Sequence, residues 1–324
     1  MKLSPESIAL GVDIGGSKIL TAVVNSRGKI LSSDYRATPP NKGAEVVAQE
    51  ILNSANHALE LGGISRERLC AIGVGAAGIS NPETGIVFAS PHLPEWHNVP
   101  LRDIIERMSG IKTFLMNDAN AAALGELYFG AGRGARNFIY VTISTGIGGG
   151  IVINGELYAG AIGTAGEIGH MTIDDNGPQC NCGNKGCWET LASGSALARE
   201  AKSQIQKGVS TSILGYAGGD VQKVTAEIIR TAAEHDDTLA KELIARTSYY
   251  LGIGFANIIN LFNPELIIIG GGLSNMGDML LKPAYEVAGK RAFIEPYRTV
   301  RFVLAELGVN SGVIGAATFA LRKL

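Results

Sequence analysis

The fold predicted for this chain is decided by residues 8–24, which read IALGVDIGGSKILTAVV, and by residues 138–153, which read FIYVTISTGIGGGIVI. In each segment an apolar strand runs into a glycine-rich turn, and a second apolar strand follows. Because the same order of parts occurs twice, we expect two related lobes, each opening with a β-hairpin.

Glycine turns between buried strands allow the backbone to approach a ligand closely, and their N–H groups suit a phosphate. A third glycine cluster follows the apolar run 266–269 and precedes a helical stretch near 276–288. A strand, a glycine turn and a helix N-terminus in this order allow the backbone to approach a nucleotide. The first turn is not a Walker A loop, and each of the three clusters by itself could be a plain turn. Together they predict a nucleotide site that comprises Gly15, Gly16, Ser17, Lys18, Thr145, Gly146, Gly148, Gly270, Gly271 and Gly272.

Strands and helices alternate along the chain, which predicts an α/β fold. Helices are expected at 44–61, 101–108, 119–128, 191–206, 221–234, 237–262 and 311–321, and further strands at 69–76, 111–116 and 300–304. The last helix is expected to pack back on the first lobe. We therefore predict a smaller N-terminal domain, residues 1–118 plus 311–324, and a larger C-terminal domain, residues 119–310.

A cysteine-rich stretch, residues 167–189, reads EIGHMTIDDNGPQCNCGNKGCWE. One histidine and three thiolates complete a tetrahedral zinc set with no open position, so His170, Cys180, Cys182 and Cys187 predict a structural zinc site. The alternative is a cysteine-rich turn with free thiols or one disulfide. The fourth cysteine, Cys70, lies in an apolar run and is expected to be a core residue.

Composition excludes several classes of function. The 324 residues are 46% hydrophobic and 18% charged, typical of a globular protein with a large core. The formal net charge of −2 gives no electrostatic footprint for nucleic acid or anionic membranes. With no signal-peptide pattern and a metal-like use of cysteine, we expect a cytoplasmic protein that acts on a small molecule.

Phosphoryl transfer to a sugar hydroxyl accounts for these parts together. Asp118 follows the strand 111–116, at the edge where α/β folds place ligands, and would accept the hydroxyl proton; the alternative is a helix cap. Asp13 is expected to hold Mg²⁺ through water. Sugar hydroxyls need carboxylate and amide partners, which Asn117, Glu167 and Glu189 would supply. His170 could bind zinc through one ring nitrogen and a sugar through the other.

Several blocks of this sequence resemble the ROK family of bacterial sugar kinases and sugar-responsive repressors. The most specific is E167-x-G-H170 followed by C180-x-C182-G183-x-x-G186-C187-x-E189. The others are DIGGSK at 13–18, GAAGISNPETG at 75–85, NDANAAALGE at 117–126, STGIGGGIV at 144–152 and IIIGGGLS at 267–274.

The resemblance implies an actin-like ATPase fold, with two ribonuclease-H-like domains around a cleft. It places the catalytic base on Asp118, the sugar ligands on Asn117, Asp118, Glu167, His170 and Glu189, and the zinc ligands on His170, Cys180, Cys182 and Cys187. Only seven residues precede Ile8, where the family's repressors carry a DNA-binding domain, so DNA binding is not expected.

Within the family the chain is most similar to the ATP-dependent glucokinases, which implies phosphorylation of the 6-hydroxyl of glucose with ATP, Mg²⁺ and structural Zn²⁺. Fructose, N-acetylmannosamine and N-acetylglucosamine are alternative substrates, polyphosphate is an alternative donor, and a non-catalytic sugar-binding regulator is the alternative function. A homodimer or homotetramer is expected by the same resemblance.

Overall fold

The computed structural model describes residues 6–324 except 17, 40–41, 91–92 and 94. The chain divides into two compact units. Unit 1 comprises Met1–Tyr140, Gly149–Gly166 and Ala305–Leu324, and unit 2 comprises Val141–Gly148 and Glu167–Leu304. The polypeptide therefore passes from one unit to the other after Tyr140, Gly148, Gly166 and Leu304.

Unit 1 is built on a five-stranded sheet with the order β3-β2-β1-β4-β8. The first three strands are antiparallel neighbours, while β4 and β8 run parallel to β1. The carboxyl ends of β1, β4 and β8 therefore meet at one edge of the sheet. The bounds are β1 Ile8–Ile14, β2 Lys18–Asn25, β3 Ile30–Ala37, β4 Leu69–Ala76 and β8 Thr113–Asn117.

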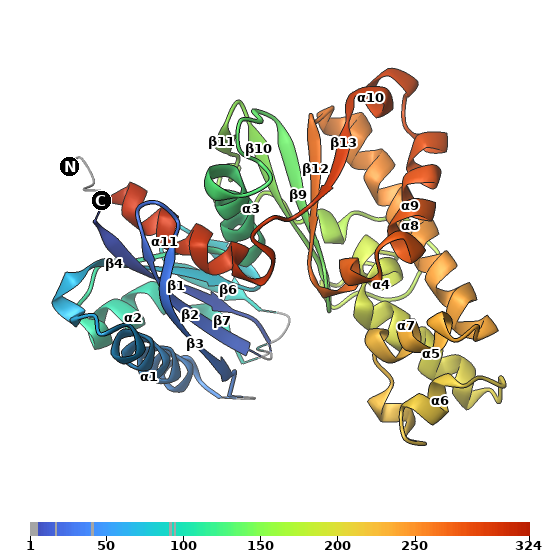
Figure 1. The fold of residues 1–324 in the computed structure, drawn as a ribbon, viewed down its shortest axis with the longest axis horizontal. Helices are drawn as coiled ribbons and strands as arrows, with labels where there is room; N and C mark the ends of the chain where they lie inside the picture. Colours follow the sequence, from blue (N-terminus) through green and yellow to red (C-terminus); the bar gives the residue numbers. More distant parts are fainter. Residues whose placement is uncertain (1–5, 17, 40–41, 91–92, 94) are drawn as a thin grey trace. The chain divides into compact units, whose positions relative to one another are not determined.

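Helices cover both faces of this sheet, as Figure 1 shows, with α1 (Ala44–Gly62) on one face and α11 (Ser311–Lys323) on the other. Side chains alternate along β1, so Leu10 packs in the core under α1, whereas Ala9 packs in the core under α11. A Cβ on Gly11 would lie 2.0 Å from the carbonyl oxygen of Val313, so glycine permits α11 to lie against the strand. The prediction that the last helix packs on the first lobe is confirmed.

The helix α3 (Asp118–Phe129) belongs to unit 1. It contacts α11 at two glycines: a Cβ on Gly125 would lie 2.4 Å from the Ser311 oxygen, and one on Gly315 would lie 1.6 Å from the Ala121 oxygen. The predicted domain boundaries, 1–118 plus 311–324 and 119–310, differ from this division because the small-residue contact keeps α3 with α11.

The rest of unit 1 includes η1 (Arg66–Arg68), α2 (Leu101–Ser109), η5 (Gly308–Asn310) and a three-stranded sheet of β5 (Ile79–Asn81), β6 (Ile86–Ala89) and β7 (His97–Val99). Cys70 is exposed, so its prediction as a core residue was wrong. β1 pairs Ile8 with Leu69 and the next residue, Ala9, with Ala71. Cys70 is thus the extra residue of a β-bulge, and its side chain leaves the alternating pattern.

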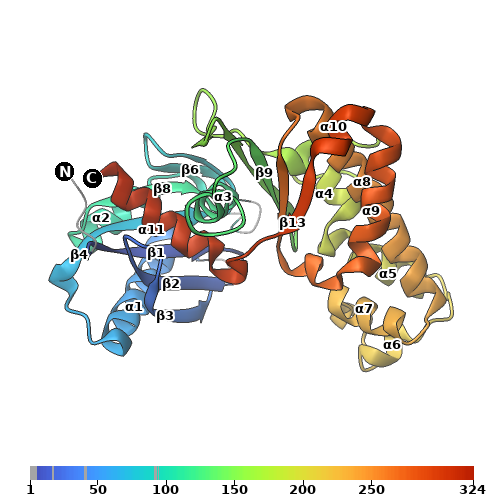
Figure 2. The same ribbon diagram turned by 45° about the horizontal axis from the view of Figure 1, so that its top comes forward.

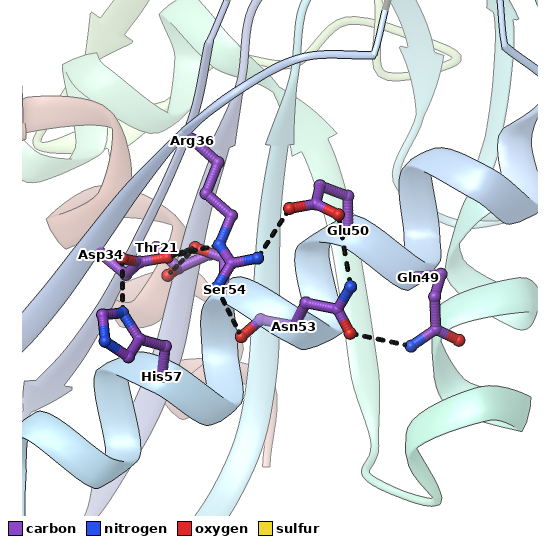
Figure 3. A network of polar contacts seen from close by, with 8 residues as sticks. All are labelled: Thr21, Asp34, Arg36, Gln49, Glu50, Asn53, Ser54 and His57. Carbon is purple, nitrogen blue, oxygen red and sulfur yellow. Dashed lines mark hydrogen bonds and ion pairs between the residues drawn. The ribbon is translucent and has the colours of Figure 1, made fainter.

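The edge strand β3 is tied to α1 by a polar network (Figure 3). The Asp34 carboxylate accepts hydrogen bonds from Arg36 Nε and Ser54 Oγ, each at 2.7 Å, and its Oδ1 lies 2.8 Å from His57 Nδ1. Arg36 also donates to Glu50 at 2.7 Å. Burial raises the pKa of Asp34, but the hydrogen bonds from Arg36, His57 and Ser54 outweigh it and hold the pKa at about 2.

A second five-stranded sheet has the order β11-β10-β9-β12-β13. Its strands are β9 (Phe138–Ile143), β10 (Ile147–Ile153), β11 (Glu156–Leu157), β12 (Leu266–Gly270) and β13 (Arg301–Leu304). The division between the units falls within β9 and β10, so β11 is part of unit 1 and β12 and β13 are part of unit 2. β12 is buried along its whole length, as its unbroken apolar run predicts.

Helices form most of unit 2, and α8 and α9 lie side by side in both ribbon views (Figures 1 and 2). At their contact a Cβ on Gly252 would lie 2.5 Å from the Ala284 oxygen. No helix among the described residues combines the length and apolarity needed to cross a bilayer. The helices are α4 Trp188–Ala192, α5 Gly194–Gln206, α6 Ile213–Tyr216, α7 Ala226–Glu234, α8 Thr238–Phe262, α9 Asp278–Arg291 and α10 Ile294–Thr299, with η2 Ile168–His170, η3 Val221–Lys223 and η4 Gly272–Met276.

Two predicted helices are interrupted. The stretch 191–206 is broken at Ser193, which is extended and caps α5 by accepting from Ala196 N. In 221–234, Thr225 is extended and caps α7 by accepting from Ile228 N. A Ser or Thr side chain that bonds the backbone two or three residues ahead starts a new helix rather than continuing the old one.

Candidate functional site

Asn117 and Asp118 lie where β8 ends and α3 begins, at the edge to which β1 also runs. Asn117 is the helix cap: its Oδ1 accepts from Asn120 N at 3.0 Å and its amide donates to the Gly78 oxygen at 3.1 Å. Asp118 is the first helical residue, and its Oδ1 accepts from Ala119 N at 2.9 Å. The cap role that the sequence left open for Asp118 therefore falls on Asn117.

Asp13, near the end of β1, has a neighbouring carboxylate in Asp118. Burial raises the pKa of Asp13 to about 7; the negative charge of Asp118 adds to the rise, and the Lys18 ammonium opposes it. Two neighbouring carboxylates that repel each other are stabilised by a cation or a proton that they share. Asp13, Asp118 and Lys18 thus form one electrostatic cluster at the sheet edge of unit 1.

The first glycine turn is closed by a hydrogen bond from Gly15 N to the Lys18 oxygen at 2.9 Å. The Gly15 carbonyl in turn accepts from Thr38 Oγ1 at 2.8 Å. Gly16 lies in the same turn, and Ser17 lies outside the described residues. The turn is therefore held on two sides beside Asp13.

The second glycine turn, Ser144–Ile147, belongs to unit 2 and is closed by Ser144 N donating to the Gly146 oxygen at 2.9 Å. The third cluster, Gly270–Gly272, approaches β9 closely: Gly271 has φ +86°, and a Cβ there would lie 2.4 Å from the Ile143 oxygen. The η4 helix begins at the last glycine of this cluster, Gly272, and α9 follows it. Thr145, Gly146, Gly148 and Gly270–Gly272 are therefore all in unit 2, on or next to β9, β10 and β12.

The four predicted zinc ligands come together in unit 2. The ligand atoms of His170, Cys180, Cys182 and Cys187 all lie within 4.8 Å of one another. Cys180 Sγ is 3.6 Å from His170 Nδ1, and Cys182 Sγ is 3.6 Å from Cys187 Sγ. A disulfide has sulfurs about 2.05 Å apart, so these two cysteines do not form one here. Burial, and then the neighbouring Cys182 and Cys180 side chains, raise the pKa of Cys187 to about 12.

The neck of the cysteine-rich loop is closed by strand-like pairing. Thr172 pairs with Cys187 as an isolated bridge, and Trp188 N donates to the Met171 oxygen at 2.8 Å. Trp188 is fully buried, and its ring nitrogen donates to the Tyr250 oxygen on α8 at 2.9 Å. A Cβ on Gly254 would lie 2.0 Å from the same ring, so the glycine makes room for it. The core of unit 2 thus anchors the loop.

The predicted sugar ligands of unit 2 lie at the two ends of this loop. His170 turns Nδ1 to Cys180, while its Nε2 lies 3.9 Å from Glu167 Oε2. At the other end, Glu189 Oε2 accepts from Ile147 N at 2.9 Å. The structure therefore groups Glu167 with His170, and Glu189 with the second glycine turn, in unit 2; Asn117 and Asp118 belong to unit 1.

Two features escaped the sequence analysis. Glu126 is fully buried and accepts hydrogen bonds from Ala131 N, Glu306 N, Leu307 N and Ser311 Oγ. A Glu within an alanine-rich helix is the signal that could have drawn attention to it. The second is the break at Ser193, signalled by Ser-Gly inside the predicted helix, which brings Gly194 N to the Ser144 oxygen at 2.8 Å.

Comparison with known proteins places these features in a family. The ROK family model matches residues 9–323. This chain belongs to the ROK family. The glucokinase of Thermotoga maritima is 38% identical over 99% of both chains. The xylose repressor of Bacillus subtilis is 32% identical over 97% of this chain and 77% of its own length.

Among solved structures, a ROK family glucokinase from Streptomyces griseus in complex with glucose and AMPPNP is 36% identical, with a TM-score of 0.87, over 97% of this chain and 99% of that one. The predicted fold class, an actin-like ATPase fold of α/β type, is thereby confirmed for this ROK chain.

Proposed function

We propose that this ROK chain transfers the γ-phosphoryl group of ATP to the 6-hydroxyl of glucose. The observation that carries the proposal is the likeness, over nearly all of both chains, to a glucokinase solved with glucose and AMPPNP. It is supported by the 38% identity to the Thermotoga maritima glucokinase and by the carboxylate cluster at the sheet edge of unit 1. The partners are therefore a sugar and a nucleotide.

Asp118 is the catalytic base in this proposal. The 6-hydroxyl oxygen attacks the γ-phosphorus, the bond to the bridging oxygen of ADP breaks, and the Asp118 carboxylate accepts the hydroxyl proton. Glu167, His170, Glu189 and Asn117 hold the other hydroxyls. Asn117 is rigid for this task because its side chain is bonded to Asn120 N and the Gly78 oxygen. The glycine turns with Gly15 and Gly146, the Gly270–Gly272 cluster and Lys18 hold the phosphates.

Mg²⁺ fits the carboxylates of unit 1. Burial, and then the negative charge of Asp118, raise the pKa of Asp13, and a divalent cation beside the two carboxylates would oppose both effects. Carboxylate, water and phosphate oxygens are the ligands that Mg²⁺ prefers. Asp13 would hold the ion through water, and the ion would supply neutralisation of phosphate charge.

Zn²⁺ fits the cysteine cluster. A tetrahedral site with Zn–S of about 2.3 Å and Zn–N of about 2.0 Å has ligand atoms about 3.5–3.8 Å apart. The two 3.6 Å separations in the cluster agree with that geometry. Burial and the neighbouring Cys182 and Cys180 side chains raise the pKa of Cys187, and a bound cation would favour its deprotonated form. Zinc would fix the spacing of Glu167 and Glu189.

A panel of hexoses tests this function. ADP release is measured with ATP and Mg²⁺ on glucose, fructose, N-acetylmannosamine and N-acetylglucosamine, and the sugars are ranked by kcat/KM. The proposal expects glucose to rank first. A different first sugar would keep the kinase and change its substrate, and sugar binding without turnover on any hexose would favour a regulator of the kind seen in the family's repressors.

Two further expectations stay predictions. Replacing ATP by polyphosphate in the same assay tests the donor. The expected dimer or tetramer is tested by light scattering on the purified protein.

A further inference from the structure

The second glycine turn is bonded to the segment that follows the cysteine-rich loop. Gly194 N donates to the Ser144 oxygen at 2.8 Å, and Ser195 N donates to the Thr145 oxygen at 3.2 Å. Glu189 Oε2 accepts from Ile147 N at 2.9 Å. Residues 189–195 therefore bond the turn at both of its ends and in its middle, and all of these groups belong to unit 2.

The Glu189 carboxylate occupies the space that a Cβ on Gly146 would fill. Such a Cβ would lie 2.2 Å from Glu189 Oε2 and 3.0 Å from its carboxyl carbon. Gly146 has no positive φ that would call for glycine on conformational grounds. Its lack of a side chain instead leaves room for the carboxylate.

The other end of the loop reaches the same residue of the turn. A Cβ on Gly169 would lie 2.0 Å from the Ile147 oxygen, so the stretch Glu167–His170 packs directly on the Ile147 backbone. Trp188, the neighbour of Glu189, is locked between Tyr250 and Gly254 of α8. The loop that carries the proposed sugar ligands and the turn proposed for phosphate thus share Ile147 as a contact.

We propose that Glu189 is a positioning residue that couples sugar binding to nucleotide binding. The inference rests on the proposed function, in which the sugar binds at Glu189 and a phosphate binds at the turn. One carboxylate oxygen, Oε2, holds the Ile147 N–H. A sugar hydroxyl that donates to the Glu189 carboxylate fixes the orientation of that carboxylate. The glycine turn, which is bonded to Glu189, then loses less conformational freedom when the phosphate binds.

Coupling of this kind is reciprocal. If glucose lowers the dissociation constant of the nucleotide by some factor, the nucleotide lowers that of glucose by the same factor. Coupling between sites is typically about 5-fold to 150-fold. The coupling factor is the nucleotide Kd without glucose divided by the Kd with saturating glucose, and we expect about fivefold or more.

The experiment is calorimetric titration of AMPPNP with Mg²⁺ into the full chain, with and without glucose, so that no turnover occurs. In Gly146→Ala the new Cβ pushes the Glu189 carboxylate away from the Ile147 N–H, although the Glu189 side chain itself is still present, and the factor should fall to about 1. The factor is the ratio of two nucleotide Kd values measured on the same variant. A substitution that weakens nucleotide binding equally with and without glucose therefore leaves the factor unchanged.

Matched variants separate positioning from general damage. Gly215→Ala adds the same Cβ to unit 2 in open space and should keep the wild-type factor. Glu189→Ala should lose the factor, whereas Glu189→Gln keeps an oxygen that can accept from Ile147 N and should retain part of it. If Gly146→Ala does not fold by circular dichroism, the comparison of Glu189→Ala with Glu189→Gln decides.

A wild-type factor near 1, or a wild-type factor retained in both Gly146→Ala and Glu189→Ala, would overturn the coupling even if both ligands bind. Failure of the proposed function looks different: the wild type would then bind no glucose or no AMPPNP, and the coupling proposal would fall with it.

Discussion

Neutralising the buried carboxylate of Glu126 should destabilise the protein strongly. Glu126 is fully buried, and its two oxygens accept from three backbone N–H groups, those of Ala131, Glu306 and Leu307, and from Ser311 Oγ. These donors come from the loop after α3 and from the segment by which the chain re-enters unit 1 after Leu304. One side chain thus fixes both segments.

The magnitude of the loss in Glu126→Gln follows from the count of acceptors. A Gln has one acceptor oxygen, so its amide nitrogen must face at least one of the three backbone N–H groups. That buried donor loses its partner at a cost of about 1–3 kcal/mol, and the bonds that remain are no longer charge-assisted. We therefore expect the free energy of unfolding to fall by about 2–4 kcal/mol.

Urea unfolding at pH 7, followed by circular dichroism, measures this loss. The matched control is Glu306→Gln, which removes a half-exposed carboxylate that pairs with the exposed Arg133; it should change stability by less than about 0.5 kcal/mol. Equal effects of the two substitutions would show that the Glu126 bonds are not what holds these segments.

Three further predictions concern the other polar groups. Asp34→Asn should lower the free energy of unfolding by about 2 kcal/mol at pH 7 and by much less near pH 2. The pKa of Asp34 is about 2 in the folded state, so the stability that its carboxylate contributes is present above pH 4 and is lost as pH falls through 2. Denaturant unfolding at both pH values tests this. Without ligands, Asp13→Asn should raise the melting temperature at pH 8 but not at pH 4. The pKa of Asp13 is raised to about 7, so ionising this carboxyl in the folded protein costs at most about 4 kcal/mol of stability as pH rises from 4 to 7. Equal shifts of the melting temperature at the two pH values would contradict this prediction. Cys182→Ala should lose bound zinc by elemental analysis and raise the KM for glucose, whereas the exposed Cys70→Ala should change neither; an unchanged KM in a folded, zinc-free variant would refute the link between the cluster and the sugar.

The sequence predicts those parts of the fold that depend on local pattern. Apolar runs mark β1, β9 and β12, glycine clusters mark their ends, and the spacing of His170, Cys180, Cys182 and Cys187 brings four ligands together as expected. The resemblance to the ROK family adds the fold class, since it rests on motifs distributed along the whole chain.

What the sequence misses depends on contacts between distant segments. Nothing local to Glu126 shows that residues 306–311 supply its donors, and nothing local to Gly146 shows that Glu189 occupies the space of its missing side chain. Cys70 was misplaced because a β-bulge takes it out of the alternating pattern that its apolar neighbours suggest. The division into compact units differs from the predicted boundary near residue 118 because α3 packs on a helix almost two hundred residues later, Ser311–Lys323.

The central claim is that this chain makes glucose 6-phosphate with Asp118 as the base, and the most direct measurement is identification of the product. Phosphorus and carbon NMR of a reaction with ATP, Mg²⁺ and glucose should show a phosphate ester on the 6-carbon. The Asp118→Asn variant should form it about 10²-fold to 10⁴-fold more slowly while keeping its fold. No ester on glucose, or an undiminished rate in Asp118→Asn, would contradict the account.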